Sequence, residues 1–483
     1  MPHGGVASTA RANPDEGLCD HYLPRKRRFC RAEKREGSRF CHTHDTLTPS
    51  AAQQGGGGGA AADAAERPRR VPCPINPNHT VYESRLQYHV KVCPDLRFVV
   101  TRLPYYRENA HALRGAVYCA AADTQHERRT HHDLDADTLR QLIARVRRCY
   151  FAVVQPQTVL LAEEVSSEGE ETPTSVRKAS AKHGPQHRAL LHCLQRAIAG
   201  FAKAQELAGD ADVAVAGFIE LGAGKGGLAV ALQDAVLSRA FALPGSKVEK
   251  QGSVAADGSS EPLLVVVDVD NFRRKGDARV CRTRLPLTRL RLDIKDLDLA
   301  AALRDPSVRK RARDGEHAGG GTSLGLRPEA LIPAEHWVAM GKHLCGACTD
   351  FALACITAPN LRTEGRLCVS VVVLATCCHH RCELQHLNSL GATDNDGQAV
   401  LRLPGTQDTL SAAEFAAIAS MSSWAVSGAF VDEESRITGV CCKRVIDALR
   451  VQYLKQSGYR AAYLCQYTQR DITEENVCIV AFA

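Results

Sequence analysis

The chain has 483 residues, of which 44% are hydrophobic and only 5% aromatic. This length and composition exclude a wholly disordered chain and allow one large cored domain with smaller modules. Lysine and arginine number 61 against 54 aspartates and glutamates, and this net charge of +7 favours a polyanionic partner.

Neither a signal peptide nor a membrane span is predicted. Residues 1–17 contain no apolar core, and no apolar run approaches about 18 residues. We therefore expect a protein of the cytoplasm, the nucleus or both, not secreted, with no membrane partner and no obligate protein partner. In such a compartment the 20 cysteines are not presumed to form disulfides, so their spacing is examined for metal binding or catalysis.

Residues 1–48 are predicted to form a small zinc finger. Its ligands follow the pattern C-x10-C-x10-C-x2-H: Cys19, Cys30, Cys41 and His44. Four soft ligands suit tetrahedral Zn²⁺, which would supply the folding energy that so short a segment lacks. His42 is an alternative fourth ligand, and an unliganded basic tail is the competing interpretation.

A basic run lies within this first module, next to Cys30. It consists of Arg25, Lys26, Arg27 and Arg28. On a scaffold fixed by metal, these side chains would present a phosphate-binding face to double-stranded RNA. The alternatives are a nuclear-localisation stretch or a solubilising surface.

Residues 71–98 are predicted to form a second zinc finger after a flexible glycine- and alanine-rich linker, residues 49–70. Its ligands follow the pattern C-x5-H-x9-H-x3-C: Cys73, His79, His89 and Cys93. His89 and Cys93 are four residues apart on a predicted helix, residues 84–92, so both face the same way. This spacing indicates a structural zinc site.

Three further segments are predicted from composition and periodicity. Residues 99–160 form a connecting segment with helical spacing over 135–154, and residues 161–181 form an acidic low-complexity linker. Residues 182–483 form the catalytic domain, which begins with an amphipathic helix at 187–207. Its alternation of apolar runs and helical patterns predicts an α/β fold.

The catalytic domain is organised around a glycine-rich turn. Residues 213–219 read as a buried strand that ends in Glu220, and a helix is predicted over 228–241. The turn between them contains Gly222, Gly224, Gly226 and Gly227. Glycines at these places allow a sharp turn and the close approach of a nucleotide.

The identity of the nucleotide depends on Glu220. Gly222, Gly224 and Gly227 satisfy the dinucleotide pattern G-x-G-x-x-G. A carboxylate at the strand end, however, would repel a pyrophosphate and attract the cationic part of S-adenosylmethionine. We therefore favour S-adenosylmethionine over NAD.

Acidic residues end two further predicted strands. Asp268 ends the strand at 263–268, where such a site receives ribose hydroxyls, and Asp293 ends a short strand at 290–294, next to the expected adenine. Strands at 336–340 and 367–374 follow. Since ligands of open α/β sheets bind at the carboxyl ends of strands, these segments are expected to border one crevice.

The chain resembles the eukaryotic tRNA 2'-O-methyltransferases that modify the fourth nucleotide of the acceptor stem. The resemblance covers almost the whole chain and rests on a linked set of motifs. The set comprises both fingers, Pro104-Tyr105-Tyr106, Lys182-His183 with Gln186, the Glu220 turn, Arg273 with Lys275 and Asp277, Asp293 to Leu297, Lys342 to Gly346, Cys377 to Cys382, Cys442-Lys443-Arg444 with Asp447, and Glu475-Asn476-Val477. The chain departs from the pattern in its long polar insertions and in having His187 where a second glutamine is expected.

The resemblance implies a Rossmann-like class I methyltransferase domain preceded by two zinc fingers. It also implies methylation of a tRNA ribose by S-adenosylmethionine. The protein must then assist loss of the hydroxyl proton, and a lysine of depressed pKa can do so. Lys342 is our candidate, with His343 as the alternative base; a phosphate-gripping role for Lys342 is equally favoured.

The cysteines of the catalytic domain leave several interpretations open. Adjacent Cys377 and Cys378 hardly suit one structural zinc, so we expect their loop to line the active-site pocket instead. Cys345, Cys348 and Cys355 are expected to be small buried hydrophobes.

Two rival functions are weighed against methyl transfer. One is an NAD-dependent oxidoreductase built on the same turn, which Glu220 disfavours. The other is a non-catalytic zinc-finger RNA adaptor, which the three acidic positions of the crevice disfavour.

Overall fold

The computed structural model describes most of the chain and divides it into two compact units, Met1–Arg69 and Arg70–Ala483. The described ranges are 13–23, 28–30, 32–41, 69–75, 79–93, 100–112, 130–161, 183–207, 214–238, 240–241, 262–269, 285, 287–313, 335–363, 367–387, 392–393, 399–426 and 431–483.

The first unit contains a two-stranded hairpin between β1 (Tyr22–Leu23) and β2 (Arg28–Phe29). Asn13 joins its two sides, because its side-chain amide donates to the backbone carbonyls of Cys19 at 2.9 Å and Cys30 at 3.1 Å. These bonds hold the two cysteines close to each other without a hydrophobic core.

The second unit begins with a short hairpin and a helix. Strands β3 (Arg70–Pro72) and β4 (Thr80–Tyr82) pair in antiparallel fashion. A 3-10 turn, η3 (Glu83–Arg85), then leads into α1 (Leu86–Val92). The predicted helix over residues 84–92 is therefore present, with its first turn tightened.

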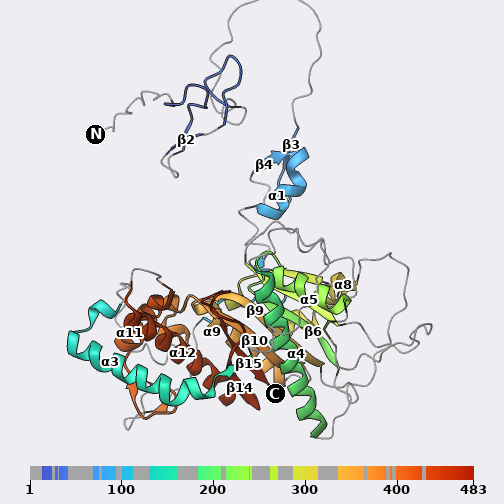
Figure 1. The fold of residues 1–483 in the computed structure, drawn as a ribbon. Coiled ribbons are helices and arrows are strands. Elements are labelled where there is room, and N and C mark those ends of the chain that lie inside the picture. Colours follow the sequence, from blue (N-terminus) through green and yellow to red (C-terminus); the bar gives the residue numbers. More distant parts are fainter. Residues whose placement is uncertain are drawn as a thin grey trace, which may run out of the picture. The chain divides into compact units, whose positions relative to one another are not determined.

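An eight-stranded sheet forms the centre of the second unit (Figure 1). Its order is β5 (Val159–Leu160), β14 (Ala461–Gln466), β15 (Val477–Phe482), β10 (Leu367–Cys377), β9 (Glu335–Cys345), β6 (Val215–Leu221), β7 (Leu263–Asp268) and β8 (Leu287–Arg291). Every pairing is parallel except those of β15, which runs antiparallel to both β10 and β14. The fold is thus α/β with a mainly parallel sheet.

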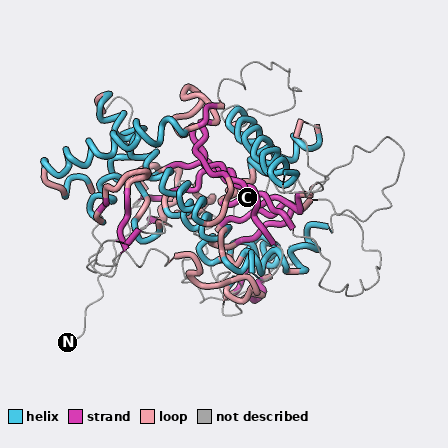
Figure 2. Tube along the Cα trace, turned by 90° about the horizontal axis from the view of Figure 1, so that it is seen from below, coloured by secondary structure: helices cyan, strands magenta, loops and turns pink. Residues whose placement is uncertain are grey.

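Helices cover both faces of this sheet, as Figure 2 shows. On β7, Leu264 and Val266 face the layer that contains α4 (Gly184–Leu207) and α5 (Gly227–Leu237). Val265 and Val267 face the opposite core, which includes residues of α7 (Leu299–Arg304), α9 (Ala347–Ile356) and α12 (Glu433–Gln456). A strand buried on both faces reads as a continuous apolar run, which is why β7 is predicted so sharply.

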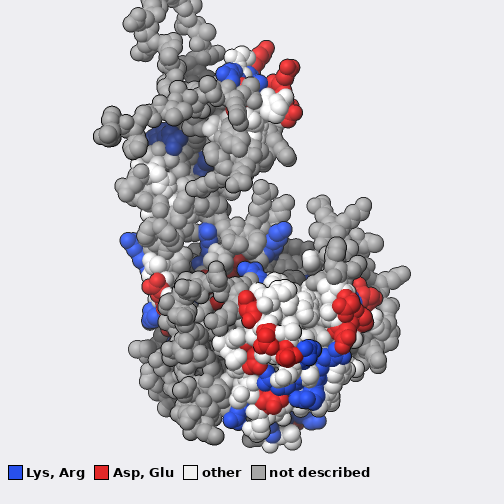
Figure 3. Space-filling view, turned by 90° about the vertical axis from the view of Figure 1, so that its left-hand side faces the viewer, with Lys and Arg blue, Asp and Glu red and all other residues white. Residues whose placement is uncertain are grey.

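The connecting segment belongs to this α/β body. Helix α3 (Ala136–Cys149) buries Leu142 and Val146 in the same core as α12, and β5 adds the outermost strand of the sheet. The outer side of α3 carries charges: Arg145 pairs with Glu414, and Arg147 pairs with Glu434. Figure 3 looks at the side where α3 lies and shows basic and acidic side chains intermixed.

The remaining described elements are short and flank the sheet. They are η5 (His131–Asp133), η6 (Tyr150–Val154), η7 (Gln155–Gln157), η9 (Ile294–Asp296), α8 (Pro306–Arg313), α10 (Pro359–Thr363), η11 (His379–Arg381), η12 (Leu384–His386), β11 (Ala392–Thr393), β12 (Ala399–Arg402), β13 (Thr409–Leu410), α11 (Ala412–Met421) and η13 (Ser422–Val426). No described helix is long and apolar enough to cross a lipid bilayer.

The predicted strands exist, but four have different bounds. The first, predicted over 213–219, runs from Val215 to Leu221, so Glu220 lies within it. The third begins at Leu287 and ends at Arg291, so the prediction that Asp293 ends it is wrong. The fourth and fifth continue to Cys345 and Cys377. Lys342 and His343 therefore lie within β9, not after it; the described side chains do not include that of His343.

Candidate functional site

The glycine turn lies where the chain order of the parallel strands reverses. From β6 the chain moves outward through β7 and β8, then returns to β9 on the other side of β6. The carboxyl ends of β6 and β9 thus form the switch point of the sheet, the usual ligand crevice of such folds. Leu221 of β6 and Gly341 of β9 are register partners. The glycine turn that follows Leu221 therefore lies beside the last residues of β9.

Three glycines of the turn adopt left-handed backbone conformations. Gly222, Gly224 and Gly226 have φ angles of 66°, 52° and 73°. A Cβ at Gly222 would also lie 2.7 Å from Cδ2 of Leu344, so the turn packs closely on the end of β9. Only glycine meets both requirements without strain.

Two carboxylates accept from backbone amides, one in this turn and one in the first turn of α5. The Oε2 atom of Glu220 accepts from the N–H of Ala229 at 2.9 Å, and Glu220 is only 3% exposed. The Oδ2 atom of Asp268 accepts from the N–H of Gly224 at 2.7 Å. Because these amides already bind carboxylates, they are not available to cradle a pyrophosphate, and the turn carries negative charge that suits a cationic ligand.

Lys342 lies close to this negative corner. It is 8% exposed, and its Nζ atom is 3.4 Å from Nδ1 of His183, the residue that precedes α4. Burial lowers the pKa of Lys342 to about 8, although the nearby charge of Glu220 acts to raise it. A lysine in this setting has a substantial neutral fraction near physiological pH.

Asp293 lies in the turn that follows β8. Its Oδ1 atom accepts from the backbone N–H of Lys295 at 3.1 Å and caps η9. The adjacent Asp296 is buried and accepts from the N–H of Asn109 at 2.7 Å, while the N–H of Asp298 donates to the carbonyl of Tyr105 at 2.9 Å. The Pro104-Tyr105-Tyr106 motif is thereby fixed beside the loop that follows β8.

A buried ionic network supports the ends of β9 and β10, and it centres on Asp447, which the sequence singles out only as part of the family motif set. The carboxylate of Asp447 accepts from Thr376 at 3.0 Å and Arg444 at 2.9 Å, and one of its oxygens lies 2.6 Å from Nε2 of His379. Burial opposes ionisation of Asp447, but His379 and two guanidinium groups hold its pKa below the usual range. Burial lowers the pKa of His379 and favours its neutral form.

Arg450 extends this network from α12 to the β9 loop. Its guanidinium donates to both oxygens of Asp350, at 2.9 and 2.7 Å, and to the carbonyl of Gly346 at 3.3 Å. Both charged side chains are about 1% exposed. Paired charges at this depth fix the position of the loop that connects β9 to α9.

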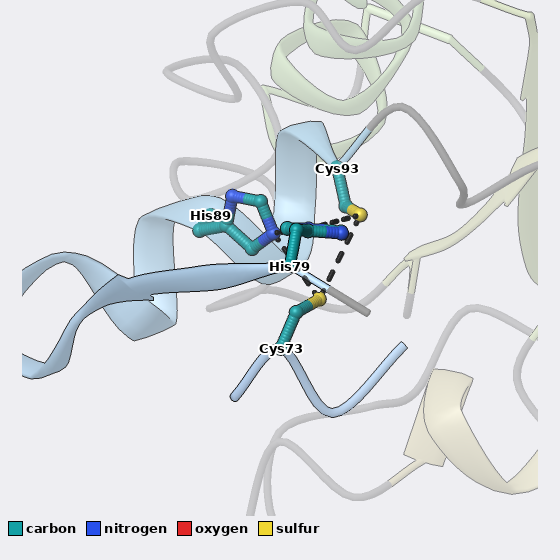
Figure 4. A group of neighbouring side chains, drawn as sticks. All are labelled: Cys73, His79, His89 and Cys93. Carbon is teal, nitrogen blue, oxygen red and sulfur yellow. Dashed lines mark hydrogen bonds between the residues drawn. The ribbon is translucent and has the colours of Figure 1, made fainter. Parts of the chain in front are cut away.

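The four predicted ligands of the second finger converge (Figure 4). The sulfur atoms of Cys73 and Cys93 are 3.7 Å apart, close to the roughly 3.8 Å expected for two thiolates around tetrahedral zinc. The Nε2 atom of His89 lies 3.2 Å from the sulfur of Cys73, and that of His79 lies 3.5 Å from the sulfur of Cys93. This donor set fits a structural zinc ion.

The first finger brings together Cys19, Cys30 and Cys41, whose sulfur atoms lie within 4.8 Å of one another. The proposed fourth ligand, His44, lies outside the described residues. The module is braced by Asp20, which accepts from Arg39 at 2.8 Å and pairs with Lys34 at 3.1 Å. Arg39 is the main cause that lowers the pKa of Asp20 to about 2.

Several predicted residues cannot be placed at the site. Arg25, Lys26 and Arg27 lie outside the described residues, as does the side chain of Arg28. The motif residues Lys182, Arg273, Lys275 and Asp277 also lie outside them. His187, which departs from the family pattern, lies against the turn, since a Cβ at Gly227 would be 3.1 Å from its ring.

The expectation that three cysteines near the end of β9 are buried holds for one of them. Cys355 is fully buried, whereas Cys345 is half-buried and Cys348 is exposed. Cys345 ends β9 and Cys348 lies in the first turn of α9, and both are reached by solvent, so they are not simply small core residues.

Three protein-family models match the catalytic part of the chain and its two fingers. Residues 194–438 and 430–482 match the family Methyltransferase TRM13. Residues 17–45 match the CCCH zinc finger in TRM13 protein, and residues 70–94 match the U11-48K-like CHHC zinc finger. No solved structure matches the chain significantly.

Similar proteins span nearly the full chain. A tRNA:m(4)X modification enzyme TRM13 of Eremothecium gossypii is 26% identical and covers 97% of this chain and 95% of its own length. The TRM13 homolog of Homo sapiens is 25% identical, with 100% and 98% covered, and the TRM13 enzyme of Saccharomyces cerevisiae is 23% identical, with 98% and 97% covered.

An α/β body with a glycine-turn site and two cysteine- and histidine-rich fingers defines a zinc-finger methyltransferase. The chain belongs to the TRM13 methyltransferase family, because that family's model matches more than half of its length. The resemblance noted from the sequence motifs is thus confirmed, and so are the methyltransferase and zinc-finger assignments.

Proposed function

We propose that this chain transfers a methyl group from S-adenosylmethionine to a ribose 2'-hydroxyl at position 4 of the tRNA acceptor stem. The observation that carries the proposal is the pairing of a carboxylate-bound glycine turn with a buried lysine at one switch point. The family supplies the reaction class, and the geometry supplies the candidate residues.

The fold proposed for the catalytic unit, residues 182–483, is that of a Rossmann-like class I methyltransferase. Counted in chain order, the strands follow 3-2-1-4-5 from β8 to β10, as in doubly wound nucleotide-binding sheets. The antiparallel β15 is inserted between the fifth strand and β14. The switch point between β6 and β9 therefore gives the donor one place to bind.

The donor site proposed at this point consists of Glu220, Gly222, Gly224, Gly226, Asp268 and Asp293. Two of its carboxylates accept from backbone amides of the turn and of the first turn of α5, which disfavours the pyrophosphate of NAD and favours a sulfonium cation. Asp293 is retained as a neighbour of the adenine although its carboxylate caps η9. Burial raises the pKa of the Cys348 thiol, and the charges of Asp293 and Asp268 both add to this effect, so the two carboxylates lie near the same thiol. The bound donor supplies an activated methyl group.

Lys342 is proposed to take the proton from the acceptor hydroxyl. Its amine is buried, has a lowered pKa and lies beside the donor corner on the neighbouring strand. These properties are those required of a general base near neutral pH. His343 is the second candidate, one position further along β9.

The RNA substrate is proposed from the relatives and from the fingers. The relatives' names describe tRNA:m(4)X modification. The first finger, residues 1–48, would bring Arg25, Lys26, Arg27 and Arg28 to the RNA backbone, since double-stranded RNA is recognised mainly by shape and phosphate contacts. The second finger, residues 71–98, would be folded by its zinc ion and would contact another part of the RNA.

The test is transfer of radioactive methyl from S-adenosylmethionine to bulk tRNA, followed by nucleoside analysis. We expect label in a 2'-O-methylated nucleoside. Lys342→Ala should abolish transfer while S-adenosylhomocysteine still binds, and Lys203→Ala, at an exposed position of α4, should leave both unchanged. Label in a base would refute ribose specificity, and near-normal turnover of Lys342→Ala would refute its role.

A further inference from the structure

Three cysteine thiols meet at the carboxyl ends of the neighbouring strands β9 and β10. Cys345 is the last residue of β9 and Cys377 the last of β10, and the two are register partners. Their sulfur atoms are 3.4 Å apart, and the sulfur of Cys378 completes a group whose members all lie within 4.8 Å of one another. Neither the proposed reaction nor the fingers use these thiols.

The backbone at Cys378 explains how two adjacent cysteines reach the same point. Successive side chains of a strand point to opposite faces, which is why a shared metal ion is unexpected for Cys377 and Cys378. Cys378, however, has φ 45° and ψ 42°, a left-handed conformation that ends the alternation and turns its thiol toward Cys345. Among the described non-glycine residues, only Asn109 also has a positive φ.

This conformation is unfavourable for a residue with a side chain. Strained backbone of this kind persists where the surrounding structure requires it, and it is concentrated at functional sites. Here its effect is to gather three soft ligand atoms at one place.

The two loops that carry the thiols are held together by close packing. Gly346 has φ 57°, and a Cβ there would lie 2.7 Å from both Cβ and the carbonyl oxygen of Arg381. Arg450 donates to the carbonyl of Gly346 at 3.3 Å and to the sulfur of Cys382 at 3.1 Å. The thiols are therefore positioned by rigid neighbours on either side, as a preformed metal site requires.

Accessibility separates this cluster from the other thiol group outside the fingers. Cys193, Cys465 and Cys478 also lie within 4.8 Å of one another, but all three are at most 1% exposed and belong to the apolar core under α4. Cys345 and Cys378 are only half-buried. An ion can thus reach the cluster at the ends of β9 and β10 while the core stays closed.

We propose that Cys345, Cys377 and Cys378 bind a third zinc ion. Their sulfur spacing is close to the 3.7 Å between the thiols of Cys73 and Cys93 in the second finger. Among the described residues, this cluster consists of these three thiols alone. Three protein ligands leave one coordination position for an oxygen atom, whereas a structural finger is closed by four. The proposal does not depend on the methyl acceptor.

The test is the zinc content of the full chain, purified with reductant and without chelator and measured by inductively coupled plasma mass spectrometry. We expect about three zinc ions per chain. Cys345→Ser should lower the content by one ion, and Cys368→Ser should not, because Cys368 lies at the other end of β10. Equal zinc content in the wild type and Cys345→Ser would overturn the proposal, as would loss of the third ion from Cys193→Ser instead.

Differential alkylation of the wild-type chain covers the case in which Cys345→Ser fails to fold. With metal bound, the half-buried Cys345 and Cys378 should be protected from iodoacetamide, and both should react after metal is removed, while the exposed Cys348 reacts in both states. Reaction of Cys345 and Cys378 before metal removal would contradict the proposal. A Cys345–Cys377 disulfide in the purified chain, detected as a loss of two hydrogens, would also contradict it.

Discussion

Arg450→Met is expected to destabilise the α/β body strongly. The substitution keeps much of the side-chain volume but removes the guanidinium, which donates to Asp350, Asp447 and Gly346 from a position that is 1% exposed. Asp350 is fully buried and would lose the cation that balances its charge. Leaving a buried carboxylate without its partner costs about 3–5 kcal/mol.

The expected shift in melting temperature follows from that free energy. For a body of more than 300 residues, each kcal/mol corresponds to roughly 1 to 2 °C, so Arg450→Met should lower Tm by roughly 3 to 10 °C. Differential scanning fluorimetry at fixed protein and zinc concentrations measures this shift. Methyl transfer measured well below Tm should also fall, because the loop after β9 loses its anchor.

Arg309→Met is the matched control. Arg309 binds Glu335 through the same two-pronged geometry, at 3.1 and 2.7 Å, but both side chains are about one-third exposed. A solvated pair contributes about 0–1 kcal/mol, so its loss should change Tm by no more than about 2 °C. If the two variants melt at the same temperature, the buried Arg450 network contributes no more to stability than the solvated Arg309 pair.

Three further predictions concern the proposed sites. If the neutral amine of Lys342 is the base, as proposed, its pKa of about 8 means that kcat should rise with pH up to about 8 and level off above it; a flat profile from about pH 7 to 9 would exclude this role. Gly222→Ala places a Cβ 2.7 Å from Leu344 at φ 66°, so calorimetry should show at least roughly tenfold weaker binding of S-adenosylhomocysteine; unchanged affinity would mean that the turn does not hold the donor. Cys73→Ser should remove one zinc ion and weaken tRNA binding in a filter assay without changing donor affinity, and full retention of zinc would show that Cys73 is not a ligand.

Local sequence patterns were sufficient for the parts of the site that depend on neighbouring residues. The strand, the glycines and Glu220 lie within a dozen positions, and backbone rules alone connect them. The second finger is similar, because one helix sets the separation of His89 and Cys93. In both cases the side chains that meet are close along the chain.

The bounds of the third strand were misjudged because a charged residue interrupts its apolar run. Arg289 lies in the middle of β8, where its guanidinium donates to the carbonyl of Gly224 at 3.1 Å. On an edge strand such a side chain can reach a polar partner without being stranded in the core. The shift of β8 toward smaller numbers then leaves Asp293 beyond its end.

The ionic network and the thiol cluster could not be derived from sequence spacing. Arg444, Asp447 and Arg450 recur every three residues, a pattern that reads equally well as a solvated helix face. Their burial depends on contacts with Asp350 and His379, which are about 70 to 100 positions away. Likewise, the pairing of Cys345 with Cys377 depends on the order of strands in the sheet.

The position of β15 constrains the order in which the sheet can assemble. Strand β14 joins the other strands through β15, and Val159 of β5 pairs with Cys465 of β14, more than 300 positions along the chain. The outer part of the sheet, β5 and β14, therefore cannot join the other strands until β15 has been synthesised. Contacts between such distant positions slow folding, so the nascent chain exposes an unpaired β10 edge for longer than a chain with local pairings would.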